Sequence, residues 1–265
     1  MHQSNLELYY QSEFLHHEKA KNLIKELNLK GNEKILDIGC GDGKITAQIA
    51  AYVPHGTVLG IDNYDPILNF ARTKFPEDIY SNLSFASGDA QNLNFINEFD
   101  VIVCFGSLHI IVNHLPVFLG IVKSLKSTGK FALLVPCQGK PEVINSIVAD
   151  LIKNQKWQSS LGDKVVYGFY QPEQYCQLLK DSGLNVEKIN TYLERMTCET
   201  KEIFATCLRQ TWISLSSRIP TTLYEDFMAE LIENYLVYNR PQDDGAIIYQ
   251  QMWLELEATK TTKAY

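Results

Sequence analysis

The chain has 265 residues, of which 45% are hydrophobic, 11% aromatic and 21% charged. This composition excludes a disordered or low-complexity chain and supports one large domain, or one core with an added subdomain. The 24 Lys and Arg residues against 31 Asp and Glu residues give a net charge of −7. That balance argues against a duplex nucleic-acid partner, because such binders usually carry an excess of basic residues.

The cysteines and the N-terminal residues indicate a protein of the cytoplasm. None of the 6 cysteines stands in a Cys-x-x-Cys pair, which favours free thiols over a disulfide framework or a zinc site, and we expect no metal. Residues 1–22 lack the apolar run of a secretory signal. No stretch approaches the roughly 18 apolar residues of a membrane span. We therefore expect a cytoplasmic monomer or homodimer with no membrane partner.

The first half of the chain alternates between short apolar runs and helical periodicity. Lys34–Ile38 is an apolar run that ends at glycines, as a buried parallel strand does. Strands that alternate with helices predict βαβ units and a parallel sheet covered on both faces. The further strands are expected at 57–61, 83–86, 99–104 and 130–135, and the helices at 44–52, 66–74 and 114–125.

The second half of the chain does not follow this regular alternation of strands and helices. Two late strands, at 184–192 and 246–256, bring the expected total to a seven-stranded, mostly parallel sheet. Helices are predicted at 142–153, at 172–182 with Gly183 as its C-terminal cap, at 199–214 and at 223–238. A capping box of Thr222 and Glu225 is expected to begin the last of them. The fold class is therefore α/β, Rossmann-like and doubly wound, with helical insertions that roof the edge of the sheet.

The strongest local signal is the run from Asp37 to Gly43, Asp-Ile-Gly-Cys-Gly-Asp-Gly, between a strand and a helix. Glycines there let the backbone turn sharply and let a ligand approach its N–H groups. Asp62 ends the second strand, 19 residues after Gly43, and such a carboxylate can accept both ribose hydroxyls of an adenosine. Lys44 stands where a dinucleotide motif has its third glycine, and no phosphate-binding P-loop is present. Asp37 would repel a phosphate and attract an ammonium group.

With these residues the chain resembles the class I S-adenosylmethionine-dependent methyltransferases. Residues 37–43 are similar to the family's glycine motif, and Gly60-Ile61-Asp62 is similar to its second motif, in which the acid holds the ribose. Residues 87–90 are similar to its third motif, in which Asp89 would face the adenine and Ala90 would offer a backbone contact. The resemblance implies S-adenosyl-L-methionine as the cofactor. Its expected contacts are Asp37, Gly39, Cys40, Gly41, Gly43, Asp62, Asn63, Asp89, Ala90, Cys104 and, near the methionyl end, Tyr10.

The stretch from Gly106 to His114 narrows the resemblance to methyltransferases of trans-aconitate, juvenile hormone acid and malonyl-carrier-protein, which act on small carboxylic acids. Ile110 stands where those enzymes have Trp, so the indole N–H that plant carboxyl methyltransferases use to hold a carboxylate is missing here. The resemblance implies a single methyltransferase domain over 1–265. Its expected parts are a helical lid at 1–30, a cofactor-binding half at 31–136, the rest of the sheet at 137–198 and 246–265, and a helical cap insertion at 199–240.

Methyl transfer from a sulfonium is an in-line displacement, so the protein mainly positions the reactants and no metal is required. A carboxylate acceptor needs little base catalysis, whereas an amine or a carbon acid needs a group that removes a proton. His109 follows the fourth strand, near the carboxyl ends of the sheet where ligands bind. We expect it to act as catalytic base or hydrogen-bond donor; the alternative is a loop histidine bonded to backbone. The expected substrate contacts are Ser107, His109, Trp212 and Tyr235.

Three functions are compatible with these motifs. We favour transfer of a methyl group to a small, partly apolar metabolite, with O-methylation of a carboxylate or hydroxyl ahead of C- or N-methylation. A tRNA or protein methyltransferase is disfavoured by the acidic balance and by Cys104 to Ser107, which replace an Asn-Pro-Pro-Tyr-type motif after the fourth strand. A non-catalytic adenosylmethionine-binding protein would carry the same cofactor motifs.

Overall fold

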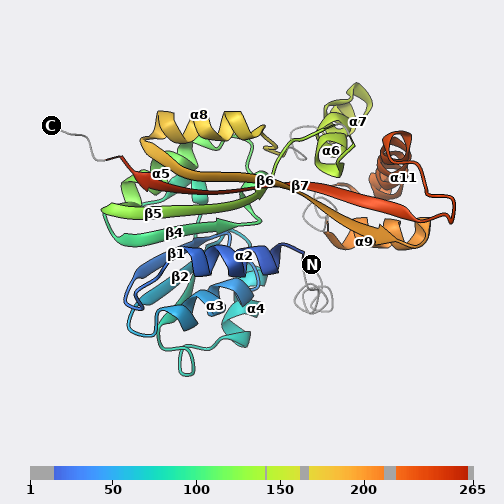
Figure 1. The fold of residues 1–265 in the computed structure, drawn as a ribbon. Helices are drawn as coiled ribbons and strands as arrows, with labels where there is room; N and C mark the ends of the chain where they lie inside the picture. The colour runs from blue at the N-terminus through green and yellow to red at the C-terminus, as the bar shows by residue number, and fades with distance from the viewer. Residues whose placement is uncertain (1–14, 141, 162–166, 212–218, 262–265) are drawn as a thin grey trace.

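A seven-stranded sheet forms the centre of the computed structural model, which describes residues 15–140, 142–161, 167–211 and 219–261 (Figure 1). The strand order is β3-β2-β1-β4-β5-β7-β6. Strands β1 to β5 are parallel, and β7 runs antiparallel to both of its neighbours. The expected mostly parallel, Rossmann-like sheet is confirmed. The strands are β1 (Lys34–Ile38), β2 (Thr57–Asp62), β3 (Leu83–Ser87), β4 (Phe99–Phe105), β5 (Leu125–Pro136), β6 (Leu184–Cys198) and β7 (Ile247–Lys260).

Helices cover both faces of the sheet. Apolar side chains of α2, α3 and α4 pack on one face, and those of α5 and α8 pack on the other (Figure 1). Two one-turn 3-10 helices, η1 and η2, follow β3 and β4. The helices are α2 (Leu15–Glu26), α3 (Lys44–Tyr52), α4 (Asp65–Lys74), η1 (Ala90–Asn92), η2 (Leu108–Ile110), α5 (Leu115–Ser124), α6 (Ile144–Lys153), α7 (Gln155–Leu161), α8 (Pro172–Ser182), α9 (Lys201–Thr211) and α11 (Thr221–Tyr238).

Local signals fix the ends of α8. Gln171 and Gln174 form a reciprocal capping box at its start, and Gly183 ends it in the left-handed conformation with φ of 96°. A glycine takes that conformation without the steric cost that a Cβ would add. The expected bounds of α8 are therefore confirmed, as are those of β1 and α3.

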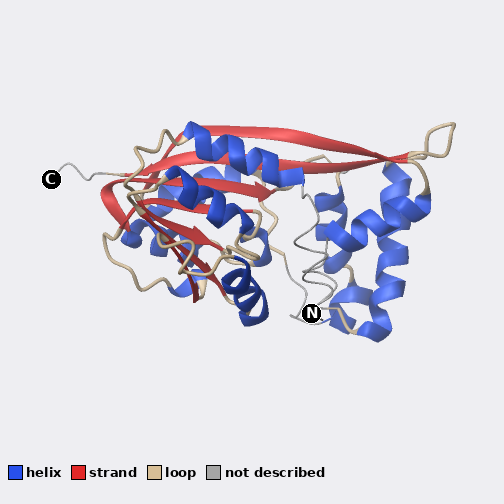
Figure 2. Cartoon of the chain, turned by 90° about the horizontal axis from the view of Figure 1, so that it is seen from below, coloured by secondary structure: helices blue, strands red, loops and turns tan. Residues whose placement is uncertain are grey.

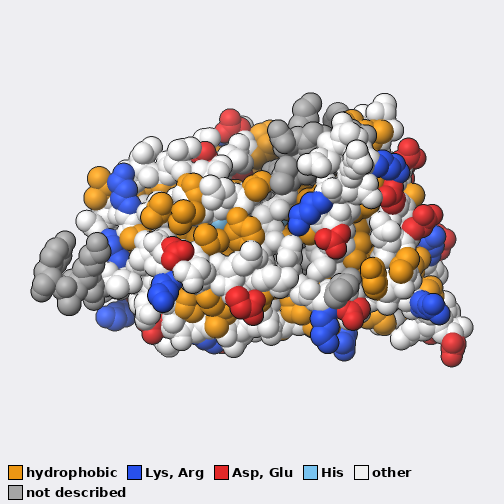
Figure 3. All heavy atoms as spheres, turned by 90° about the horizontal axis from the view of Figure 1, so that it is seen from above, with side chains coloured by type: hydrophobic (Ala, Val, Ile, Leu, Met, Phe, Trp, Pro, Cys, Tyr) orange, Lys and Arg blue, Asp and Glu red, His pale blue; other side chains and the backbone are white. Residues whose placement is uncertain are grey.

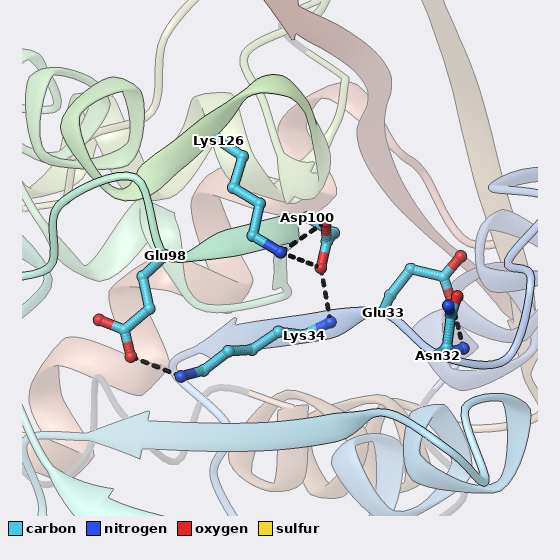
Figure 4. A network of polar contacts seen from close by, with 6 residues as sticks. All are labelled: Asn32, Glu33, Lys34, Glu98, Asp100 and Lys126. Atoms are coloured by element: carbon cyan, nitrogen blue, oxygen red, sulfur yellow. Dashed lines mark hydrogen bonds and ion pairs between the residues drawn. The ribbon is translucent and has the colours of Figure 1, made fainter.

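A polar network ties the amino ends of β1, β4 and β5 together (Figure 4). The Lys34 N–H donates to Asp100 Oδ2 over 2.9 Å, and Lys126 Nζ donates to both oxygens of the same carboxylate over 2.8 Å. Burial raises the pKa of Asp100, but these hydrogen bonds outweigh it and leave that pKa below its usual range. The network holds the three central strands in register at the edge of the sheet opposite the carboxyl ends.

The β6–β7 pair extends well beyond the rest of the sheet. The pairing of β7 with β5 ends where Trp253 stands opposite Pro136. The pairing of β7 with β6 continues beyond that point to Ile247, which stands opposite Cys198. Figure 1 shows the two strands running on from the sheet to the helices α6, α7, α9 and α11, which we call the cap, and Figure 2 shows the same extension from below. β6 is thus longer than the expected strand, which ended at residue 192.

The cap has its own apolar core. Buried side chains of α6, α7, α9 and α11 form one cluster with the outer ends of β6 and β7. The sequence did not predict α7, and it placed α6 with the sheet, so the cap is larger than the expected insertion at 199–240. α11 also begins differently: Pro220 is its N-cap without a side-chain bond. Glu225, expected in a capping box, instead accepts a hydrogen bond of 2.8 Å from Arg209.

Phe227→Ala is expected to lower the free energy of unfolding by about 3–5 kcal/mol. Phe227 is fully buried and packs edge-on against Trp157, with ring centroids 5.0 Å apart. Urea unfolding measures the loss. Val237→Ala on the same helix is the control, because Val237 is 66% exposed and its truncation should change stability by no more than about 0.5 kcal/mol. Equal losses in the two variants would contradict this packing of the cap.

The outer surface carries mixed charge. On the face shown in Figure 3, basic and acidic side chains of the described residues are interspersed and form no basic stripe, unlike the footprint of a duplex-binding protein. Within the described ranges, no helix combines the length and the apolar character needed to cross a membrane.

Candidate cofactor site and active site

A cleft opens at the carboxyl ends of β1, β2 and β4. This is the point where the strand order reverses, which is where open α/β sheets bind their ligands. The cleft is lined by Ile38, Gly39, Ile61, Asp62, Asn63, Gly88, Asp89, Ala90, Cys104, Ser107, Leu108, Ile110 and Ile111.

Asp62 presents a carboxylate at the end of β2. Its Oδ2 accepts the Gly41 N–H over 3.1 Å and its Oδ1 accepts the Tyr64 N–H over 3.0 Å. Burial raises the pKa of Asp62, and the N–H bonds oppose that rise. The Asn63 N–H also hydrogen-bonds this carboxylate, which keeps acceptor capacity for a ligand because each of its oxygens has two acceptor positions. The geometry therefore suits two adjacent hydroxyl groups, as on a ribose.

Asp89 is held rigidly at the start of η1. Its Oδ1 accepts the Gln91 N–H over 2.9 Å, and its Oδ2 accepts Asn92 Nδ2 over 2.7 Å. Asp89 and Ala90 both line the cleft, next to Ile61 at the end of β2. This part of the wall therefore combines fixed polar groups with apolar surface, which suits a purine ring.

Gly39 allows the glycine loop to touch the segment after β4. Its φ is 73°, and a Cβ at this position would lie 2.1 Å from Ser107 Oγ. The Ser107 hydroxyl donates to the Ile38 carbonyl over 3.0 Å, and the Gly39 N–H donates to the Ile61 carbonyl over 2.8 Å. Only glycine fits this contact, which sets the floor of the cleft.

Asp37 and Cys40 lie beneath the loop and do not line the cleft. The Asp37 carboxylate accepts the Thr46 hydroxyl over 2.7 Å, and burial raises the pKa of Asp37 to about 7. Burial and the nearby Asp37 also raise the pKa of the Cys40 thiol, so it stays protonated. Gly41 and Gly43, both at positive φ, likewise shape the loop and are absent from the lining.

The structure brings together seven of the predicted site residues. They are Gly39, Asp62, Asn63, Asp89, Ala90, Cys104 and Ser107. Tyr10 and Trp212 lie outside the described residues. Six further lining residues were not predicted, namely Ile38, Ile61, Gly88, Leu108, Ile110 and Ile111. Each is next to a motif residue at a strand end, so adjacency was the available signal.

Tyr235 has a structural position, contrary to the expectation that it binds substrate. It is fully buried in the core of the cap. Its hydroxyl donates to the Ile248 carbonyl over 2.6 Å and accepts the Gln250 N–H over 2.8 Å. Both bonds tie α11 to β7, and Tyr235 is absent from the lining of the cleft.

His109 lies on η2, between two residues that line the cleft, but is not itself part of the lining. Its ring stacks on those of Tyr167 and Phe169, with centroids 5.6 Å apart in each case and interplanar angles of 12° and 15°. Its carbonyl accepts the Gly168 N–H over 2.9 Å. The segment from 167 to 169 thus fixes the plane of the imidazole.

His114 supports the same wall from behind. It is fully buried, and its Nε2 lies 2.8 Å from the Ile111 carbonyl. Burial lowers the pKa of His114 to about 4, so the neutral ring donates this hydrogen bond at pH 7. The bond holds Ile111 in the wall of the cleft.

Comparison with known proteins identifies the family. A family model described as a methyltransferase domain matches residues 29–208. The chain belongs to this family. Methyltransferase 235L of Invertebrate iridescent virus 6 is 26% identical over 242 residues, which cover 83% of this chain and 89% of the viral protein. Trans-aconitate 2-methyltransferase of Methylobacterium radiotolerans is 27% identical over 182 residues, 67% of this chain and 68% of that enzyme.

A solved structure shows the same fold. The YcgJ protein of Bacillus subtilis matches with a TM-score of 0.72 at 17% identity, over 93% of this chain and all of that one (100%). With the family model, this match makes the chain a class I S-adenosylmethionine-dependent methyltransferase, as the motifs predicted. The side chains of the cleft fit that cofactor, because the Asp62 carboxylate lines the cleft and can accept a hydrogen bond from a ribose hydroxyl. No group of three or more metal-binding side chains occurs among the residues that the structure describes.

Proposed function

We propose that this methyltransferase transfers the methyl group of S-adenosylmethionine to a small, partly apolar metabolite by metal-independent in-line displacement. The observation that carries the proposal is the cleft itself, where the Asp62 carboxylate stands at one side and apolar Leu108, Ile110 and Ile111 stand at the other. The similarity to trans-aconitate 2-methyltransferase supports a small acceptor. O-methylation of a hydroxyl or carboxylate is favoured, with C- or N-methylation as the alternative.

In this proposal each part of the cleft has one task. Asp62 would accept the ribose hydroxyls, and Asp89 and Ala90 would hold the adenine. Asp37, beneath the loop and outside the lining, would attract the ammonium group through its charge. The bound cofactor supplies an electrophilic methyl group on a sulfonium. Once bound, the cofactor would offer this methyl carbon to an acceptor lone pair, and its sulfur would keep the electron pair of the broken carbon–sulfur bond. His109 takes the proton that a hydroxyl or amine acceptor releases.

Titration calorimetry tests the cofactor, and turnover tests the reaction. S-adenosylmethionine and S-adenosylhomocysteine should bind, and NAD should not. Wild-type protein should then form S-adenosylhomocysteine with at least one member of a metabolite panel. Binding without turnover on any acceptor would instead favour a non-catalytic binding protein.

We also propose that the protein is a cytoplasmic monomer or homodimer. Size-exclusion chromatography with light scattering tests the oligomeric state, and cell fractionation tests the compartment.

His109→Phe is expected to lower the rate of the chemical step by about 10²–10⁴, the usual contribution of general acid–base catalysis. The phenyl ring keeps the stack on Tyr167 and Phe169 but cannot take a proton. Single-turnover kinetics measure the step, and calorimetry should find cofactor affinity nearly unchanged. His109→Ala should be as slow as His109→Phe. A phenylalanine variant with wild-type rate would give His109 a packing role only.

Cofactor affinity is expected to fall as the pH drops below 7. Burial raises the pKa of Asp37 to about 7, so the free protein binds a proton there below that pH. A nearby ammonium favours the ionised carboxylate, so binding expels the proton and weakens by up to about tenfold for each pH unit below 7. Calorimetry at pH 6 and 8 measures this. Asp37→Asn should bind weakly at both values; a wild-type affinity independent of pH would contradict the role of Asp37.

A further inference from the structure

A row of polar side chains lies where β6 and β7 leave the sheet. On β6, Tyr192 stands opposite Trp253 of β7, and Glu194 stands opposite Gln251. Residues two apart on a strand share a face, so these four side chains lie together. Trp253 is the last residue of β7 that pairs with β5, at Pro136.

This row marks the junction between the core and the cap. Tyr192 and Trp253 pack with the sheet core under α2, whereas Met196 and Tyr249, the next pair along, pack with the cap helices. Glu194 and Gln251 lie between the two clusters. Figure 2 shows the two strands crossing from the core to the cap.

The junction lies at the same edge of the sheet as the cleft. Phe105 ends β4 and pairs with Leu134 of β5, two residues before Pro136, which stands opposite Trp253. Only β5 therefore stands between the carboxyl end of β4 and the two β7 residues of the row.

Two polar atoms of the row have no partner within the described ranges. The Glu194 Oε2 and the Tyr192 hydroxyl are both buried and make no hydrogen bond there. Burial raises the pKa of Glu194, while a hydrogen bond between the Trp253 side chain and this carboxylate and the charge of Lys19 oppose that rise. Lys19 itself lies over the Tyr192 ring, 4.1 Å from its centroid.

Such atoms are uncommon in native structures, because burying a carboxylate oxygen without a hydrogen-bond donor is costly. A ligand that supplies a donor removes this cost. A ligand carboxylate would instead meet the Glu194 charge at close range. The absence of an indole donor at Ile110 also disfavours a carboxylate ligand, because the cleft wall there is apolar and offers it no side-chain N–H.

We propose that Glu194 and Tyr192 form the acceptor-recognition side of the active site and select a head group that donates hydrogen bonds, a hydroxyl or an ammonium, over a carboxylate. This inference rests on the proposed function and names its acceptor class. Glu194 accepts the hydrogen bond from the head group, and the Tyr192 hydroxyl adds a second contact. His109 would take the proton that a hydroxyl loses on methyl transfer, or the proton that an ammonium must lose beforehand to free the nitrogen lone pair.

The test compares Glu194→Gln and Tyr192→Phe with wild type. A panel of small alcohols, amines and carboxylic acids on shared carbon skeletons is first screened for S-adenosylhomocysteine formation by the wild type, and the methylated atom is identified by mass spectrometry. For the best acceptor, Glu194→Gln is expected to lower kcat/KM about tenfold or more, since a charge-assisted hydrogen bond is lost. Tyr192→Phe should lower it less. Calorimetry should find S-adenosylhomocysteine affinity within about twofold of wild type in both.

Glu187→Gln is the matched control, because Glu187 is exposed on the same strand and hydrogen-bonds Asn185 and Thr259. It should leave kcat/KM unchanged. A carboxylate as the best acceptor, or Glu194→Gln and Tyr192→Phe with wild-type kcat/KM, would overturn the inference and leave the row as a site for buried water. A wild type that methylates nothing while binding the cofactor would instead count against the proposed function, a result distinct from either of these.

Discussion

Asp62→Ala is expected to weaken S-adenosylmethionine binding at least about tenfold while the fold stays intact. If Asp62 holds the ribose, the substitution removes two charge-assisted hydrogen bonds, each worth roughly 1.5–3 kcal/mol. The carboxylate is already oriented by the N–H groups of Gly41 and Tyr64, so no rearrangement is needed for it to receive the hydroxyls. Titration calorimetry measures the affinity, and circular dichroism measures the fold.

Two companion variants sharpen this test. Asp62→Asn keeps an acceptor oxygen without the charge, so its affinity should fall between those of the wild type and the alanine variant. Asp65→Asn removes a nearby exposed carboxylate that does not line the cleft and should bind normally. An alanine variant with unchanged affinity and a normal spectrum would reduce Asp62 to a turn residue.

Gly39→Ala is expected to abolish measurable cofactor binding and to lower the free energy of unfolding by about 2–5 kcal/mol. A Cβ would lie 2.1 Å from Ser107 Oγ, and overpacking of this kind costs roughly 1–3 kcal/mol. The positive φ adds roughly 1–2 kcal/mol for a residue with a side chain. The loop or the segment after β4 must then move, and both line the cleft. Thermal unfolding and calorimetry measure the two effects.

Ser107→Gly in the Gly39→Ala background should restore part of the binding, because it removes the atoms that the new methyl group meets. Gly183→Ala is the matched control. It carries the same kind of positive-φ strain, with φ of 96°, but its nearest neighbour is a Val122 methyl 3.9 Å away. That variant should lose stability and keep normal cofactor affinity. Failure of the double variant to recover any binding would contradict the contact between Gly39 and Ser107.

Those parts of the fold that local chemistry determines could be predicted from the sequence. β1 is a continuous apolar run because it is covered on both faces, and α8 has a capping signal at each end. The residues that form the cofactor side of the cleft follow from strand ends and glycines, so Gly39, Asp62 and Asp89 could be assigned before their geometry was known.

Other features depend on tertiary packing that a single sequence does not display. The outer half of β6 alternates weakly, and its residues are ordered by pairing with β7, so Glu194 fell outside the expected strand. Tyr235 lies on the apolar stripe of α11, where a core tyrosine and a substrate contact have the same pattern. Its bonds to the β7 backbone decide between them.

The expected capping box failed for a related reason. Thr222 and Glu225 have the right spacing, but the helix begins two residues earlier than expected, with Pro220 as its N-cap and Thr221 as its first residue. Arg209 of α9 pairs with Glu225. Proline favours the start of a helix through its fixed φ. A tertiary ion pair and a proline together replaced the local cap.

Transfer of an isotope-labelled methyl group from S-adenosylmethionine tests the central claim most directly. The protein is incubated with methyl-labelled cofactor and a metabolite panel, and the label is followed by mass spectrometry in the small-molecule, protein and RNA fractions. The label should appear on a small molecule, in equal amount to the S-adenosylhomocysteine formed, with the wild type and much less with Asp62→Ala. Label that stays on the bound cofactor, or that enters only the protein or RNA fraction, would contradict a small-molecule methyltransferase.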